Sequence, residues 1–204
     1  MLILYGGKRS PFARRVAISL GLQGLPFERR PVDLFGADFE SFRAHNPLSR
    51  VPVLSTPAGD LIETAAIIDY LETTVPPAQR LLPAPGPERI ACLQTIALAT
   101  AIAEKGVAYV YETERRPPAL VWSEWVDRLA AQLSQGLLAL EARTLADGWF
   151  GGDQPDGADA AVVAAVDFLG TITGLADRPP TPRLAALADR SRGLAAFAST
   201  HPQA

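Results

Sequence analysis

The segment from Val75 to Pro87 divides the sequence into two parts with different patterns. It holds five prolines and one glycine, and neither a helix nor a central strand continues through such a composition. Before it, short apolar segments alternate with helix-like ones, whereas the part after it is helical in pattern throughout. The sequence therefore predicts an α/β domain over 1–78, a linker over 79–87 and an all-helical domain over 88–204.

The first part has the pattern of a small α/β unit. Strand-like segments lie at 2–5, 27–32, 53–55 and 61–62, in that order. Helical patterns begin at Ser10, near Asp38 to Ala44, and at Thr64, between or after the strands. Four short strands interleaved with helices predict one sheet with helices packed on it.

The second part predicts four or five helices, separated by Pro117-Pro118, the loop 148–157 and residues 178–182. One helix should bury a face whose members recur every three or four residues: Trp122, Val126, Leu129, Leu133, Leu137 and Leu140. We expect Trp122 and Trp125 to be core residues. Asp156 should cap the helix that follows it, and Asp159 should accept amide hydrogens in its first turn.

Composition excludes several classes of function. A chain of 204 residues with 48% apolar residues can bury a large core. The net charge of −3 argues against a general nucleic-acid binder. The N-terminus offers no secretory apolar region, and the stretch from Ala91 to Ala103 is too short to span a bilayer. We expect a soluble protein of a reducing compartment, most simply the cytoplasm, with no membrane partner.

The single cysteine and the two histidines carry no predicted chemistry. Cys92 cannot form an intramolecular disulfide and lies in an apolar run, where a thiol usually acts as a small buried filler. His45 and His201 are far apart and lack neighbouring ligand pairs, so no metal site is expected.

Three turns occur in a fixed order within the first 64 residues, and together they suit a small thiol peptide. They are Ser10-Pro11-Phe12 after an apolar strand, Arg50-Val51-Pro52 before another strand, and Glu63-Thr64 at a helix start. Pro11 suits the first helical position, which places Ser10 at a helix N-terminus. A hydroxyl and a helix terminus there could stabilise a thiolate, which a free thiol with a pKa of about 8.5 forms only sparingly at neutral pH.

Each of these residues also has a purely structural reading. Ser10 could cap only its own helix, and spacing alone leaves the two readings even. Tyr5, at the end of the first strand, is a rival donor to the thiolate, or else it packs against the sheet. The basic residues Lys8, Arg9, Arg14 and Arg15 could attract an anionic ligand, but a solvated helix face is the safer interpretation. Thr64 could be a plain helix cap.

A cis peptide bond before Pro52 would turn the backbone of Val51 outward, so that an extended peptide could pair with it as an added strand. Glu63 and Thr64 would present a carboxylate, a hydroxyl and helix-start amides, which suit an ammonium and a carboxylate at one end of the same ligand.

These segments resemble the glutathione transferase superfamily. The likeness is strongest in Leu4-Tyr5-Gly6, in the stretch from Ser10 to Val16, in Asn46 to Leu54 and in Glu63-Thr64, which follow the thioredoxin-like domain of that family. Asp156 and Asp159 resemble its capping box and buried aspartate. The Ser-Pro-Phe-Ala stretch also looks like a glutaredoxin-type or omega-type site whose cysteines are replaced by Ser10 and Ala13, which argues against thiol–disulfide exchange.

The resemblance implies a cis Pro52 and a division of roles at a glutathione site. Ser10 would stabilise the thiolate, and Phe12 would be one of the glutathione-binding residues. Val51 would pair with the cysteinyl backbone, Glu63 and Thr64 would hold the γ-glutamyl end, and Arg50 would contact the glycyl carboxylate or flank the site. A homodimer is likewise implied.

The second substrate would face the end of the first long helix, where Tyr109 and Glu112 are the candidates, although Tyr109 and Tyr111 could equally be core residues. We expect an enzyme that transfers glutathione to a small apolar electrophile. A non-catalytic glutathione-binding or protein-interaction module remains open, as does a glutathione-dependent dehalogenase, isomerase or peroxidase.

Overall fold

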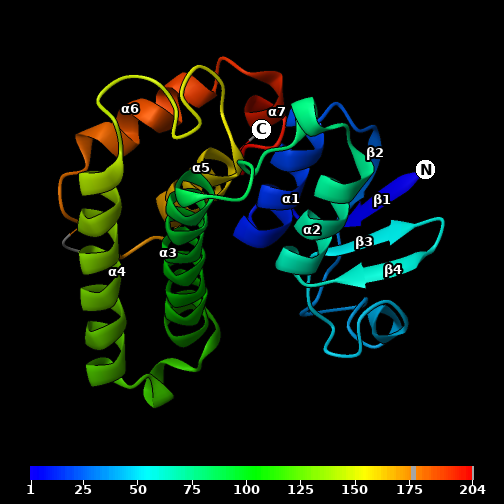
Figure 1. Cartoon of the computed structure of the whole chain (residues 1–204). Coiled ribbons are helices and arrows are strands. Elements are labelled where there is room, and N and C mark those ends of the chain that lie inside the picture. The colour runs from blue at the N-terminus through cyan, green and yellow to red at the C-terminus, as the bar shows by residue number, and fades with distance from the viewer. Residues whose placement is uncertain (176–177, 204) are drawn as a thin grey trace. The chain divides into compact units, whose positions relative to one another are not determined.

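The computed structural model describes residues 1–175 and 178–203 and contains two compact units (Figure 1). One unit combines Met1–Pro83 with the segment that begins at Arg192, and the other is Ala84–Ser191. The α/β and all-helical fold class predicted from the sequence is confirmed. The predicted boundaries differ from these units, because the last residues pack with the first unit and not with the helical one.

The first unit is built on a four-stranded mixed sheet in the order β2-β1-β3-β4. The strands are β1 (Leu2–Tyr5), β2 (Phe27–Arg30), β3 (Val53–Thr56) and β4 (Gly59–Ile62). β1 pairs parallel with β2 and antiparallel with β3, and β4 pairs antiparallel with β3. The parallel pair requires a crossover, and α1 (Pro11–Leu22) provides it.

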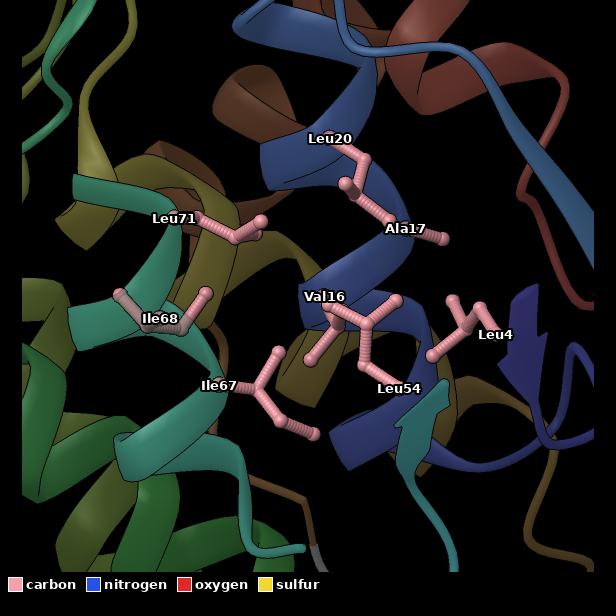
Figure 2. Packing of buried hydrophobic residues seen from close by; sticks show 8 residues of the cluster. All are labelled: Leu4, Val16, Ala17, Leu20, Leu54, Ile67, Ile68 and Leu71. Atoms are coloured by element: carbon pink, nitrogen blue, oxygen red, sulfur yellow. The ribbon is translucent and has the colours of Figure 1, made fainter. Parts of the chain in front are cut away.

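Helices α1 and α2 (Thr64–Thr74) form the core of this unit with the two central strands. Figure 2 shows the buried side chains from both helices meeting those of β1 and β3: Leu4, Val16, Ala17, Leu20, Leu54, Ile67, Ile68 and Leu71. In each helix these residues recur at intervals of one, three or four positions, as one buried face requires. The short helix α7 (Ala195–Ala198) packs on α1 and extends the core.

The second unit is helical. Its elements are α3 (Pro87–Val110), a π-helical turn (Tyr111–Arg115), α4 (Ser123–Arg143), α5 (Gly157–Gly170) and α6 (Pro182–Ser191). α3 packs against both α4 and α5. A methyl group at Gly106 would come within 2.7 Å of Leu169 Cδ2, so a glycine is needed for the close approach of α3 to α5.

The start of α5 has the predicted capping arrangement. The Asp156 carboxylate accepts the amide hydrogens of Ala158 at 2.7 Å and Asp159 at 3.2 Å. In return, Asp159 Oδ2 accepts the amide of Asp156 at 2.9 Å. Asp159 also accepts the amides of Phe150 and Gly151 and is fully buried, so it ties the preceding loop to the helix start.

Three expectations about local structure were wrong. Trp122 is 59% exposed, because it precedes α4 as its N-terminal flanking residue and lies outside the buried face that begins at Leu129. The predicted helix near 38–44 is only a 3₁₀ turn over Ser41–Ala44. The stretch from Ala91 to Ala103 was predicted to be too short to span a bilayer, but it is part of a longer helix. This helix, Pro87–Arg115, could cross a membrane by length and composition. Core helices of soluble proteins pass the same test, and this one packs on α4 and α5.

Candidate functional site

The register of the sheet brings the three predicted turns to one end of it. Tyr5 at the end of β1 pairs with Val53 at the start of β3, and Val53 pairs with Ile62 at the end of β4. The turn that leads to Ser10 follows β1, Val51-Pro52 precedes β3, and Glu63-Thr64 follows β4. All three segments therefore extend from the same row of paired residues, although they are far apart in the sequence.

Ser10 is the N-terminal cap of α1, as predicted. Its Oγ accepts the amide hydrogen of Ala13 at 3.2 Å, and Pro11 occupies the first helical position. A serine hydroxyl can accept one hydrogen bond and still donate its own hydrogen. The structural reading of Ser10 is thus confirmed, and it leaves the hydroxyl hydrogen available for a ligand.

A close backbone approach at Gly6 joins the first two turns. Gly6 has a φ of +141°, and a methyl group there would lie 2.5 Å from Ala13 Cβ and 3.3 Å from Val51 Cβ. Only glycine allows this packing without displacement of its neighbours. Gly6 therefore holds the first turn of α1 against the Val51 segment.

The Val51-Pro52 peptide bond is cis, as expected. Asn46 shapes the preceding turn: its side chain donates to the carbonyl of Arg50 at 2.8 Å and accepts the amide of Leu48 at 3.0 Å. Within residues 1–175 and 178–203, the amide and carbonyl of Val51 make no hydrogen bond. Val51 can therefore pair with an extended peptide, whereas the Arg50 side chain is exposed beside it.

Thr64 is the first residue of α2 and not its cap, which corrects one reading of the sequence. The flanking residue is Glu63, which has a φ of +70° and makes no capping hydrogen bond with its side chain. Thr64 Oγ1 is buried and has no hydrogen-bond partner in the described part of the chain. A buried hydroxyl without a partner is costly, and a strained non-glycine residue beside it is typical of a ligand site.

Tyr5 contacts other aromatic residues. Its ring lies 5.6 Å from that of Phe42, edge to face, and 4.5 Å from the imidazole of His45. These ring contacts support the packing interpretation of Tyr5.

The basic residues near Ser10 do not form a solvated face. Arg14 and Arg15 are 1% and 9% exposed, and Arg14 Nε donates to the carbonyl of Thr200 at 3.1 Å. Arg9 is exposed, and Lys8 is partly exposed. The expectation of a solvated helix face was therefore wrong for Arg14 and Arg15, because Arg14 binds the segment after α7.

The two candidates for the second substrate lie within the helical unit. Tyr109 is buried, and its hydroxyl donates to the carbonyl of Gly174 at 2.9 Å, as a core residue would. Glu112 is also buried, but it lines a cavity of about 350 Å³. The other residues of this cavity are Arg116, Leu120, Trp122 and Trp125.

Sequence reasoning predicted Glu112 at a substrate pocket but missed the other four residues of this cavity, and it missed the role of Gly6. The spacing of Glu112 and Arg116, four positions apart, is the signal for an ion pair on one helical face, and two tryptophans follow within ten residues of Arg116. Gly6 gave no comparable signal, because its close neighbours come from other segments.

Comparisons with known proteins agree with this fold. Residues 4–79 match the family model of the glutathione S-transferase N-terminal domain. Residues 123–190 match that of the glutathione S-transferase C-terminal domain. The chain is 32% identical to maleylacetoacetate isomerase of Pseudomonas aeruginosa, over 98% of this chain and 95% of the relative.

Solved structures give the same result. A glutathione S-transferase of Methylobacterium radiotolerans in complex with glutathione sulfonate is 32% identical, with a TM-score of 0.87 over 98% of this chain and 94% of that one. A bacterial maleyl pyruvate isomerase, described as a zeta-class glutathione S-transferase, is 29% identical, with a TM-score of 0.80 over 98% and 96% of the two chains. The chain belongs to the glutathione S-transferase family.

Proposed function

We propose that the end of the sheet around Ser10, Val51 and Thr64 binds glutathione and stabilises it as a thiolate. The observation that carries this proposal is the register that aligns Tyr5, Val53 and Ile62, because it gathers the three turns at one place. The relative from Methylobacterium was solved with glutathione sulfonate, which supports the same ligand here.

The backbone and polar groups at this end suit the parts of the tripeptide. The amide and carbonyl of Val51, which make no hydrogen bond within the described part of the chain, would pair with the cysteinyl backbone. The γ-glutamyl end carries both charges. It would be held by the Thr64 hydroxyl, which has no hydrogen-bond partner among the described residues, by the amides at the start of α2 and by the Glu63 carboxylate. Arg50 would meet the glycyl carboxylate, and Phe12 would border the sulfur.

Ser10 would activate the sulfur by donating its hydroxyl hydrogen to it. A hydrogen bond to a charged acceptor contributes about 1.5–3 kcal/mol, and one pKa unit corresponds to about 1.4 kcal/mol. The bound thiol would thus have a pKa about one to two units below that of free cysteine. The N-terminus of α1 adds about 0.3–1 kcal/mol in the same direction. Tyr5 remains the alternative donor.

The thiolate would attack an electrophilic carbon of an apolar compound. In a transfer reaction the sulfur–carbon bond forms, the leaving group departs with the bonding electron pair, and glutathione is consumed. Proximity of the two bound reactants would contribute to the rate together with activation of the sulfur.

Isomerisation is the second candidate, because two of the relatives are named as isomerases. The same thiolate could add to an activated carbon–carbon double bond, allow rotation about the resulting single bond and then leave. Glutathione would be regenerated in each cycle. Dehalogenase and peroxidase reactions would use the same thiol site with other second substrates.

The experiment that tests the proposal has two parts. Glutathione binding is measured by calorimetry for the wild type and Thr64→Val, which keeps the shape and removes the hydroxyl. We expect the variant to bind about 5- to 10-fold more weakly, as the loss of one hydrogen bond implies.

The second part follows glutathione consumption with an aryl halide and with a cis-unsaturated diketo acid. Net consumption of glutathione supports transfer, and formation of product without consumption of glutathione supports isomerisation. Equal binding by Thr64→Val would contradict the placement of the γ-glutamyl end, and binding without either reaction would favour a non-catalytic module.

We also propose a cytoplasmic homodimer. Ile90 and Leu93 lie almost one turn apart on α3 and are 64% and 40% exposed, so they could contribute apolar contacts with a second copy. Light scattering should give twice the mass of the chain, and a monomer at all concentrations would contradict the proposal.

A further inference from the structure

The cavity in the helical unit has an ion pair on one side and apolar side chains on the others. It lies where the π-helical turn after α3 connects to α4, and it is lined by Glu112, Arg116, Leu120, Trp122 and Trp125. All five residues belong to the unit Ala84–Ser191. The geometry of the cavity therefore depends on this unit alone.

The charged side is held in a fixed orientation. Glu112 is 6% exposed, and its Oε1 accepts the amide hydrogen of Trp122 at 3.0 Å. The same oxygen forms an ion pair with Arg116, whose Nε lies 2.9 Å away. The amide of Trp122 lowers the pKa of the Glu112 carboxyl, and Arg116 lowers it further, whereas partial burial opposes them. The carboxylate thus stays ionised at neutral pH, and it fixes the guanidinium by a single nitrogen.

The other edge of this guanidinium is available. Among residues 1–175 and 178–203, the two terminal nitrogens of Arg116 have no hydrogen-bond partner, and the side chain is about half exposed. A guanidinium can bind a carboxylate through two parallel N–H donors on one edge. Arg116 can therefore donate two parallel hydrogen bonds from its terminal nitrogens to a ligand in the cavity.

The remaining walls are apolar and unusually exposed. Trp122 and Leu120 are 59% and 64% exposed, and Trp125 is partly buried. Indole rings give a planar apolar surface that stacks well on other planar groups. Exposed large apolar side chains next to a cavity often mark a site of interaction.

We propose that this cavity binds a small carboxylic acid with a planar, conjugated body. The carboxylate would take the terminal nitrogens of Arg116, and the planar body would lie against the indoles. A cation would be repelled by Arg116, and a neutral molecule would leave the guanidinium edge unused. The charge of Glu112 does not prevent this binding, because its carboxylate is engaged by Nε and by the Trp122 amide. The inference goes beyond the glutathione chemistry and does not depend on it.

The test compares trans-cinnamate with trans-cinnamamide, which has the same planar body and no charge. Calorimetric titration of the whole protein should show cinnamate binding, and Arg116→Gln should weaken it by about 10- to 100-fold while leaving the weaker binding of cinnamamide unchanged. Arg115→Gln is the matched control, because it removes a neighbouring charge that does not line the cavity. Arg116→Lys keeps the charge without the fork and should fall between the wild type and Arg116→Gln.

The proposal would be overturned by no binding of cinnamate to the wild type, by equal affinity for the acid and the amide, or by equal losses in the Arg115 and Arg116 variants. Trp122→Ala should weaken both probes. Titration in saturating glutathione should give the same cinnamate affinity, whereas competition would place the acid at the sheet end and contradict the assignment. Loss of glutathione binding alone would count against the proposed function and not against this cavity.

Discussion

Replacement of Asp159 by alanine should destabilise the helical unit strongly, because one carboxylate accepts three backbone amides. The amides belong to Phe150 at 3.1 Å, Gly151 at 3.3 Å and Asp156 at 2.9 Å. An amide that loses its acceptor costs about 1–3 kcal/mol, and the lower value applies here because water can reach these partly exposed residues. The expected loss is about 3 kcal/mol, a large share of the 5–15 kcal/mol that a folded protein typically has.

Thermal and urea unfolding, followed by circular dichroism and tryptophan fluorescence, measure this loss. For a chain of this size, 3 kcal/mol corresponds to a fall in Tm of about 6–12 °C. Asp159→Asn keeps one acceptor oxygen and should lose about half as much. Asp153→Ala, an exposed change in the same loop, should stay within about 0.5 kcal/mol of the wild type. Equal stability of the Asp159→Ala and Asp153→Ala variants would refute the reasoning.

Three further predictions concern Gly6 beside the site, the buried Cys92 of α3 and the contact of Glu72 with the linker. Gly6→Ala should lose about 1–3 kcal/mol of stability and also weaken glutathione binding, because the added methyl group would clash with Ala13. A methyl group at Gly7 would contact no atom, so Gly7→Ala should leave both stability and glutathione binding nearly unchanged. Burial raises the pKa of the Cys92 thiol to about 12, so the thiol should resist a disulfide reagent in the native protein at pH 8 and react at once after unfolding. Because the pKa is higher in the folded than in the unfolded state, the free energy of unfolding should fall as pH rises from about 9 towards 12. Fast labelling of the native protein would contradict the burial of this thiol. Glu72→Ala removes a buried carboxylate that accepts the backbone amides of Leu81 and Leu82 in the linker. The free energy of unfolding, measured by urea titration, should fall by about 2–3 kcal/mol. An unchanged urea midpoint would contradict the role of this contact.

Local signals in the sequence predicted the starts of α1 and α5 correctly. Ser10 followed by proline, and Asp156 followed by an acidic residue three positions later, are both helix caps in the structure. These signals act over a few residues, so they survive in any tertiary context. The three ordered turns placed Val51 and Thr64 at the site, and the family resemblance added the part of glutathione that each would hold. The sheet register supplies the reason that they lie near Ser10.

Tertiary contacts explain what the sequence did not predict. Arg14 has the appearance of a surface charge, but its partner is the carbonyl of Thr200, far along the chain. Trp122 continues the periodicity of α4 by spacing, yet the helix begins after it, so the indole is exposed at the cavity. The segment after Ser191 packs with the first unit through α7 and α1, which no local pattern indicates.

The central claim is that the Ser10 hydroxyl stabilises the thiolate of bound glutathione. The measurement is the ultraviolet difference absorbance of the bound thiolate, titrated against pH in the wild type, Ser10→Ala, Ser10→Thr and Tyr5→Phe, each at saturating glutathione. The account predicts a thiol pKa about one to two units below that of free cysteine in the wild type, in Ser10→Thr and in Tyr5→Phe, and a pKa close to that of free cysteine in Ser10→Ala. A Ser10→Ala protein that binds glutathione with the lowered pKa intact, or a Tyr5→Phe protein that loses it, would contradict the account.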